Sequence, residues 1–167
     1  YGPHQGIMTM RRALNERLPN QAHYFNAGFP TKRFTPAGPD HAQVAASAGM
    51  ADYVDAVYAH HHGDGGAPAP ERARAVHALQ SNQEQRLMEP LLDFLRARRD
   101  VRLIGPEVPQ GRVPTVALHL ERPGLEAAAA LAQHGIMAGG GHFYATRLLE
   151  ALGIDPDHGV LRLSFVH

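Results

Sequence analysis

Residues 160–166 read VLRLSFV, and this alternation of apolar and polar residues decides the fold. In an extended chain, successive side chains point to opposite sides, so the pattern predicts a β-strand with one apolar face. That face needs a sheet and a covering layer to be buried. Its apolar members are Leu161, Leu163 and Phe165, and the residues on the opposite side are Arg162 and Ser164.

Upstream of this strand, helical and extended patterns alternate over the second half of the chain. A long helix is predicted over 71–99, with a kink or a restart at Pro90 because proline removes a helical hydrogen bond. The pattern indicates an α/β to α+β fold in which helices pack on one face of a mixed sheet. The further strands are predicted at 101–104, 113–120 and 136–138, and the further helices at 125–134 and 144–152.

The first 62 residues are less regular. A short apolar run over 6–10 predicts a buried strand, and 11–18 predicts one or two helical turns. Glycine and proline favour an extended loop over 25–39. Asp40 is a plausible N-cap for a helix over 41–59. The following run GDGGAPAP at 63–70 is the clearest break in the chain and predicts a linker.

Composition excludes several classes of function. Sixteen basic and sixteen acidic residues give no net charge, which offers no support for nucleic acid as a partner. No stretch approaches the roughly 18 apolar residues of a membrane helix, so no membrane partner and a cytoplasmic location are expected. Cysteine is absent, which excludes disulfides and a catalytic thiol. The chain begins at Tyr1 without methionine, and strand-like alternation runs into its last residues, so we expect a fragment of a longer protein.

Three groups of residues suggest chemistry, each with a plain structural alternative. His60, His61 and His62 with Asp64 suit a transition metal, yet neighbouring helical side chains diverge, which favours a solvated helix end. The run GGGHFY at 139–144 fits either an anion-binding loop or a tight turn.

Arg162 is the third of these groups, because it lies on the polar side of an apolar strand. Its guanidinium could bind a carboxylate through two hydrogen bonds, or it could pair with a surface acid on an edge strand. The sequence leaves both alternatives open.

Four segments together resemble the C-terminal portion of class V aminotransferases, in particular the cysteine-desulfurase-like subgroup. YGPHQGIM at 1–8 resembles the family's Y-G-P-x-x-G, and AGPDH at 37–41 resembles G-T-P-N-x. GIMAGGGHFYA at 135–145 resembles G-I-x-x-R-x-G-x-x-C-A, and GVLRLSFVH at 159–167 resembles the start of G-x-x-R-x-S-x-x-x-Y-N. These relatives are fold-type I enzymes that use pyridoxal 5′-phosphate (PLP), and the resemblance covers essentially the whole chain in order.

The resemblance implies a domain organisation. Residues 1–62 would be the C-terminal part of the large PLP-binding domain, 63–70 the linker, and 71–167 the small α+β domain. The enzyme would be a homodimer that acts on a small amino acid as a transferase or a lyase.

The resemblance also implies roles for individual residues. Arg162 would bind the substrate carboxylate, with His142 and Tyr144 beside the substrate. No catalytic residue is expected in this chain, because the lysine that holds the cofactor would lie just upstream of Tyr1. The chain alone is therefore expected to be inactive. The residues expected near the cofactor are Tyr1, His4, Gly38 and Pro39.

The chain departs from the family pattern at three positions. Tyr144 replaces the desulfurase cysteine, and we expect it to fill space rather than to carry protons. Gly139 replaces the loop arginine, and Gly38 replaces the loop threonine. An alternative is a non-catalytic binding or interaction module with the same fold; a metal-binding protein built on the histidine cluster is less favoured.

Overall fold

The computed structural model describes residues 4–35, 38 and 40–165. The chain divides into two compact units, residues 1–74 (unit 1) and 75–167 (unit 2). The division falls inside helix α3, Ala69–Arg96, shortly after the predicted linker. Assignment of either unit to a domain of an enzyme stays a prediction.

Unit 1 consists of helices and irregular chain. It contains α1 (Arg12–Arg17), the short 3-10 helices at Tyr24–Asn26 and Pro30–Lys32, and α2 (His41–His62). The predicted strand over 6–10 is wrong: this run forms no regular element, and Ile7 and Met8 are 68% and 65% exposed. A strand needs a neighbour for its backbone groups, and the described part of unit 1 contains none.

Helix α2 begins where the sequence predicts. The Asp40 carboxylate accepts hydrogen bonds from the backbone N–H groups of Ala42 and Gln43, at 3.0 and 3.2 Å. These bonds satisfy two of the donors that every helix leaves free at its start. The helix continues to His62, beyond the predicted end at 59, and stops at Gly63, whose φ of 75° suits glycine.

Arg72 fixes the first turn of α3 to α2 within unit 1. Its guanidinium donates to both carboxylate oxygens of Asp55, each at 2.8 Å, and to the carbonyl of Ala67 at 2.6 Å. The two-point pairing raises the pKa of Arg72 and lowers the pKa of Asp55. Both groups are substantially exposed, so water screens the attraction between them.

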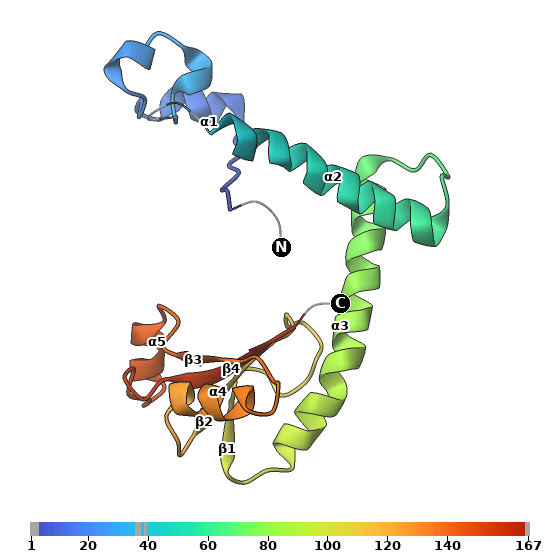
Figure 1. Ribbon diagram of the computed structural model, residues 1–167. Coiled ribbons are helices and arrows are strands. Elements are labelled where there is room, and N and C mark those ends of the chain that lie inside the picture. Colours follow the sequence, from blue (N-terminus) through green and yellow to red (C-terminus); the bar gives the residue numbers. More distant parts are fainter. Residues whose placement is uncertain (1–3, 36–37, 39, 166–167) are drawn as a thin grey trace. The chain divides into compact units, whose positions relative to one another are not determined.

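Unit 2 contains a four-stranded sheet in the order β1-β2-β4-β3, with all three pairings antiparallel (Figure 1). The predicted mixed sheet is therefore wrong. The segment between β1 and β2 is shorter than the dozen or so residues that a parallel crossover needs. The elements are β1 (Val101–Ile104), β2 (Thr115–Leu120), α4 (Gly124–Ala132), β3 (Gly139–Gly141), α5 (Thr146–Ala151) and β4 (Val160–Ser164).

Hydrophobic clusters cover both faces of this sheet, so the predicted single layer of helices is wrong. On one face, α3 and α4 pack on the sheet, and Leu163 and Phe165 join Leu161 there as the alternation predicts. On the other face, Leu149 of α5 forms a smaller cluster with Ile154 and with Val160 of β4. The fully buried side chains of the larger cluster are Met88, Leu92 and Val116.

Two further expectations need correction. Helix α3 runs through Pro90 as one element, so there is no restart. The strand predicted at 136–138 instead begins at Gly139 and consists of three glycines. A Cβ on Gly140 would overlap the backbone of Gly124, so the first turn of α4 lies directly on β3. No helix in the described residues is long and apolar enough to cross a membrane.

Candidate functional site

Arg162 lies near the middle of β4, an interior strand of the sheet of unit 2. It stands opposite Ala117 of β2 and Gly139 of β3. The alternative in which Arg162 belongs to an edge strand is therefore wrong. Because a strand with neighbours on both sides is held along its whole length, the Cα of this arginine has a fixed position.

The Arg162 guanidinium stacks on an aromatic ring rather than on a carboxylate. Its Cζ lies 4.0 Å from the ring centroid of Phe143, a cation–π contact. In the part of the chain that the structure describes, no ion pair includes Arg162. A planar guanidinium stacked on its face keeps its N–H donors in the plane, where they can reach a carboxylate.

Phe143 is held by several contacts. Its ring packs against the smaller cluster of unit 2, next to Leu149 and Val160. A Cβ on Gly139 would lie only 3.0 Å from the ring carbons of Phe143. Glycine at position 139 therefore leaves the space that this ring occupies.

The turn after β3 is strained. Phe143 and Tyr144 have φ values of 49° and 61°, in the left-handed region that side chains larger than glycine rarely adopt. Such residues cost about 1–3 kcal/mol each and gather at functional sites. The turn exposes the Tyr144 side chain almost completely, at 99%.

His142 takes part in the same turn. The backbone N–H of Tyr144 donates to Nδ1 of His142 at 3.1 Å, and the two rings lie edge to face with centroids 6.3 Å apart. In this arrangement Nδ1 accepts the hydrogen bond. Among the described residues, no hydrogen bond, ion pair or ring contact joins His142 or Tyr144 to Arg162.

The structure thus puts Arg162, His142 and Tyr144 in unit 2, whereas His4 and Gly38 are exposed in unit 1. Tyr1 and Pro39 lie outside the described residues. Phe143 is the site residue that sequence reasoning missed. The available signal was an aromatic residue directly after a run of glycines, the residues that let a bulky ring approach the backbone.

The described residues do not form a cradle for PLP. The single lysine of the sequence, Lys32, donates to Asn26 Oδ1 at 3.4 Å and lies over the ring of Phe29. A Cβ added to Gly38 would meet nothing within 4 Å, so no closely packed wall surrounds that backbone. PLP therefore does not fit the described part of this chain alone, and we derive no reaction step from it.

The histidine cluster ends helix α2. His60 and His61 meet edge to face, and His62 stacks on Tyr58, each pair with centroids 4.8 Å apart. Among the described residues, no three histidine, aspartate or glutamate side chains are grouped so that they could hold a metal ion. The cluster is a helix terminus, where imidazoles suit the negative end of the dipole.

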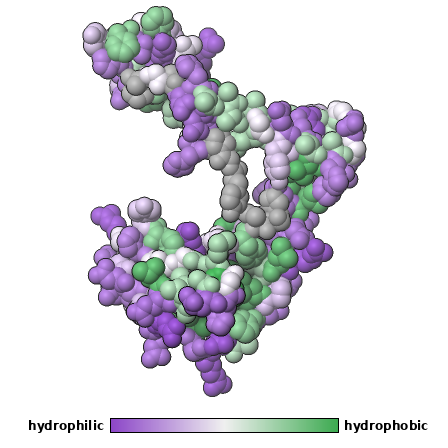
Figure 2. All heavy atoms as spheres, viewed as in Figure 1, coloured by the Kyte–Doolittle hydropathy of each residue, from purple (hydrophilic) through white to green (hydrophobic). Residues whose placement is uncertain are grey.

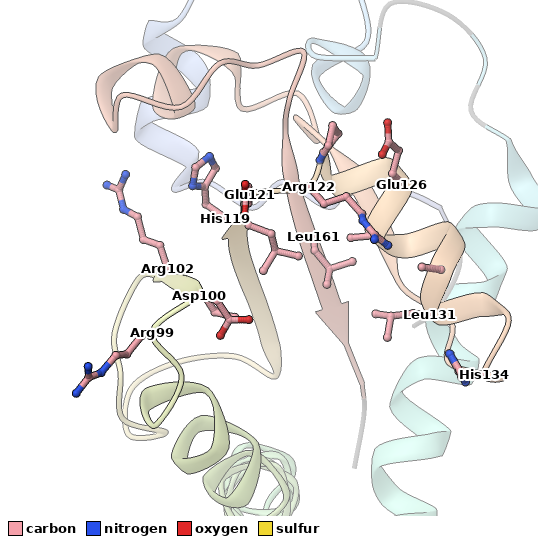
Figure 3. A pocket seen from close by; sticks show the side chains of 15 residues that line it. Arg99, Asp100, Arg102, His119, Glu121, Arg122, Glu126, Leu131, His134 and Leu161 are labelled. Atoms are coloured by element: carbon pink, nitrogen blue, oxygen red, sulfur yellow. The ribbon is translucent and has the colours of Figure 1, made fainter.

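Unit 2 also has an open groove of about 920 Å³ between the ends of β1 and β2 and helix α4, which the sequence patterns did not predict. Its floor includes Leu161 and Leu131, and charged side chains of both signs surround it, among them Arg102, Arg122 and Glu126 (Figure 3). Arg162, His142 and Tyr144, the described site residues predicted in unit 2, do not line it. The groove is therefore separate from the Arg162 site.

His119 lines this groove and lies against a second imidazole. Its ring centroid is 5.1 Å from that of His158, whose Nε2 lies 2.8 Å from the carbonyl oxygen of Leu120. Burial, and then the nearby His158 and Arg102, lower the pKa of His119. Protonation of this ring is thus disfavoured in the folded chain.

Comparisons with known proteins identify no family for the chain. No family model and no curated protein sequence match it. Among solved structures, it is similar to the apo structure of a cysteine desulfurase from Thermococcus onnurineus NA1, at 24% sequence identity and a TM-score of 0.41. The match covers 59% of this chain and 25% of that chain, so the chain spans only part of the length of that protein.

Proposed function

We propose that this chain is the C-terminal portion of a PLP-dependent enzyme of the class V aminotransferase type that acts on a small amino acid. The four sequence segments that resemble the family are the ground for this proposal. Within it, Arg162 binds the α-carboxylate of the substrate. The lysine that holds PLP belongs to the longer protein outside this chain, Tyr1, His4, Gly38 and Pro39 lie near the cofactor, and the active enzyme is a homodimer.

The position and the contacts of the Arg162 guanidinium support its role in binding the substrate. It lies on an interior strand, stacks on Phe143 and pairs with no carboxylate in the described residues. A carboxylate that binds both N–H donors of one edge would form two charge-assisted hydrogen bonds. His142 and Tyr144, in the strained turn beside Phe143, would line the substrate side of this site.

The test is the kinetics of the longer enzyme with Arg162→Ala. Loss of charge-assisted hydrogen bonds should lower kcat/KM for the amino acid by about 10- to 100-fold. Retention of PLP should not change, because the arginine does not hold the cofactor. Arg102→Ala, on strand β1, is the matched control and should leave kcat/KM near the wild-type value. Unchanged kinetics in Arg162→Ala would refute the role.

Tyr144 has a smaller part in the proposal. Its side chain is 99% exposed, and we expect it to take the place of the family cysteine rather than to carry protons. Tyr144→Phe should therefore keep most of the activity. A large loss of kcat would instead identify the phenol as a proton carrier.

A further inference from the structure

The contact between Phe143 and Arg162 is made from a strained turn. Phe143 adopts a φ of 49°, which disfavours a bulky residue, and the next residue is strained as well. A glycine at 143 would relieve the strain, but it would remove the ring. The chain therefore keeps an aromatic ring at position 143 although the backbone there is strained.

The ring is enclosed from several sides. Gly139, directly opposite Arg162 in the sheet, has no side chain, and the ring carbons of Phe143 lie 3.0 Å from where its Cβ would be. The apolar cluster of Leu149, Ile154 and Val160 packs against the same ring. Phe143 therefore has little freedom to move, and a group that stacks on it is held in turn.

We propose that Phe143 is the positioning residue for Arg162, and that it directs the free N–H edge of the guanidinium to one planar carboxylate of the substrate. This inference rests on the proposed function. The guanidinium carbon lies over the ring, 4.0 Å from its centroid, and the cation–π attraction uses none of the N–H donors of the arginine. A carboxylate of the protein paired with Arg162 would occupy these N–H donors, whereas the ring leaves them available to a ligand.

The same arrangement indicates the class of substrate. Opposite Arg162 in the sheet stands Gly139, and the ring of Phe143 lies against that glycine. Among the described residues, this part of the site presents the cation of Arg162 beside an apolar ring. It suits an amino acid with a single carboxylate and a small or apolar side chain better than a dicarboxylate.

The experiment is a titration of the full chain with acetate at constant ionic strength, with chloride as the reference anion. The side-chain Nε–H signal of Arg162 is followed by NMR. Wild-type protein should show a saturable shift that Arg162→Gln abolishes. Phe143→Leu should weaken acetate binding by about threefold to tenfold, the range expected for loss of a cation–π contact, and Phe143→Tyr should restore it.

Controls separate a positioning role from a folding role. The free energy of unfolding is measured for each variant, and Leu148→Ala, an exposed change on α5, should affect neither binding nor stability. If Phe143→Leu fails to fold, Gly139→Ala serves instead, because its Cβ displaces the ring while Phe143 stays in the sequence. It should also weaken binding.

The outcomes distinguish the two proposals. Acetate binding at Arg162 that is equally tight in Phe143→Leu, or in Gly139→Ala, overturns the positioning role and leaves the proposed function intact. Absence of any acetate shift at Arg162 in wild-type protein contradicts the carboxylate role itself, and the inference about Phe143 fails with it.

Discussion

The two units of this chain differ in how their structure is held. Unit 2 buries a continuous apolar cluster between its sheet and two helices, with Met88 and Leu92 fully covered. In the described part of unit 1, the buried residue is polar, Asn26, and α2 buries none of its side chains. Figure 2 shows apolar surface along α2. Apolar burial thus stabilises unit 2, whereas local hydrogen bonds, such as the Asp40 cap of α2, hold the described part of unit 1.

This difference has a meaning for the proposed enzyme. The residues assigned to the substrate carboxylate lie in the unit with the core, whereas His4 and Gly38, expected near the cofactor, lie in unit 1, whose described residues form no apolar cluster. A rigid arginine needs a packed support, and unit 2 supplies it. We expect unit 1 to gain its buried surface from the remainder of the longer protein.

The largest contrast is predicted for a matched pair of methionines in helices. Met88→Ala, at a fully buried position in α3, should lower the free energy of unfolding of unit 2 by about 2–5 kcal/mol. Met50→Ala, in α2, should change stability by less than about 0.5 kcal/mol. Urea unfolding measures both, followed by the amide signals of β2 and β4 for Met88→Ala and by those of α2 for Met50→Ala. Equal effects would remove the distinction between the units.

A pair of glycines gives the next contrast. Gly140→Ala would push a Cβ into the backbone of Gly124 and should destabilise unit 2 by about 1–3 kcal/mol. Gly49→Ala, in the interior of α2 where a Cβ meets nothing within 4 Å, should instead favour the helix by about 0.5–1 kcal/mol. Thermal unfolding compares the two variants. A neutral Gly140→Ala would contradict the direct contact of α4 with β3.

The cap of α2 tests how unit 1 is held. Asp40→Ala removes the acceptor for two backbone N–H groups and should cost the helix about 1 kcal/mol. Amide hydrogen exchange in the first turn of α2 should then be about fivefold faster. Asp52→Ala, an exposed change within the same helix, is the control and should leave that rate nearly unchanged. Unit 2 should not respond to either variant.

The smallest expected effect concerns pH. Because the folded chain holds the pKa of His119 below its ordinary value of 6.5, the unfolded chain binds more protons in this range. The free energy of unfolding of unit 2 should keep its full value above the pKa that His119 has in the unfolded chain. It should decrease as the pH falls from there through the lower pKa that His119 has in the folded chain. Urea midpoints across this window measure the slope. His119→Gln should flatten it, whereas a change at exposed His134 should not; an equal slope in both variants would contradict the assignment.

The sequence predicted most elements of unit 2 because its strands alternate and its helices keep regular spacing. Strand β4 is the clearest case: Leu161, Leu163 and Phe165 join one cluster, as the alternation requires. The antiparallel direction of the strands and the smaller apolar cluster on the second face of the sheet were not predicted. Both depend on contacts between segments that lie far apart in the sequence. The apolar run at Ile7 was misassigned because local pattern does not reveal whether a neighbouring strand exists.

The candidate site was predicted only in part. Arg162 stands out as a polar residue within an apolar strand, so a single strand suffices to find it. Phe143 could not be found in this way, because its contact crosses from the turn after β3 to β4 and depends on the missing side chain of Gly139. The glycine run was interpreted as a loop or a turn, yet Gly139–Gly141 form strand β3. Because these residues have no side chains, the ring of Phe143 can lie against Gly139, and the first turn of α4 can lie against Gly140.

The most direct test of the proposed enzyme is the intact mass of the natural protein that contains these residues, after reduction with borohydride. Reduction fixes PLP covalently to the lysine that holds it. The account predicts a mass well above the 18.1 kDa of this chain, with a phosphopyridoxyl adduct on a lysine that precedes Tyr1. A natural protein of about this mass without an adduct would contradict the assignment and leave a binding module.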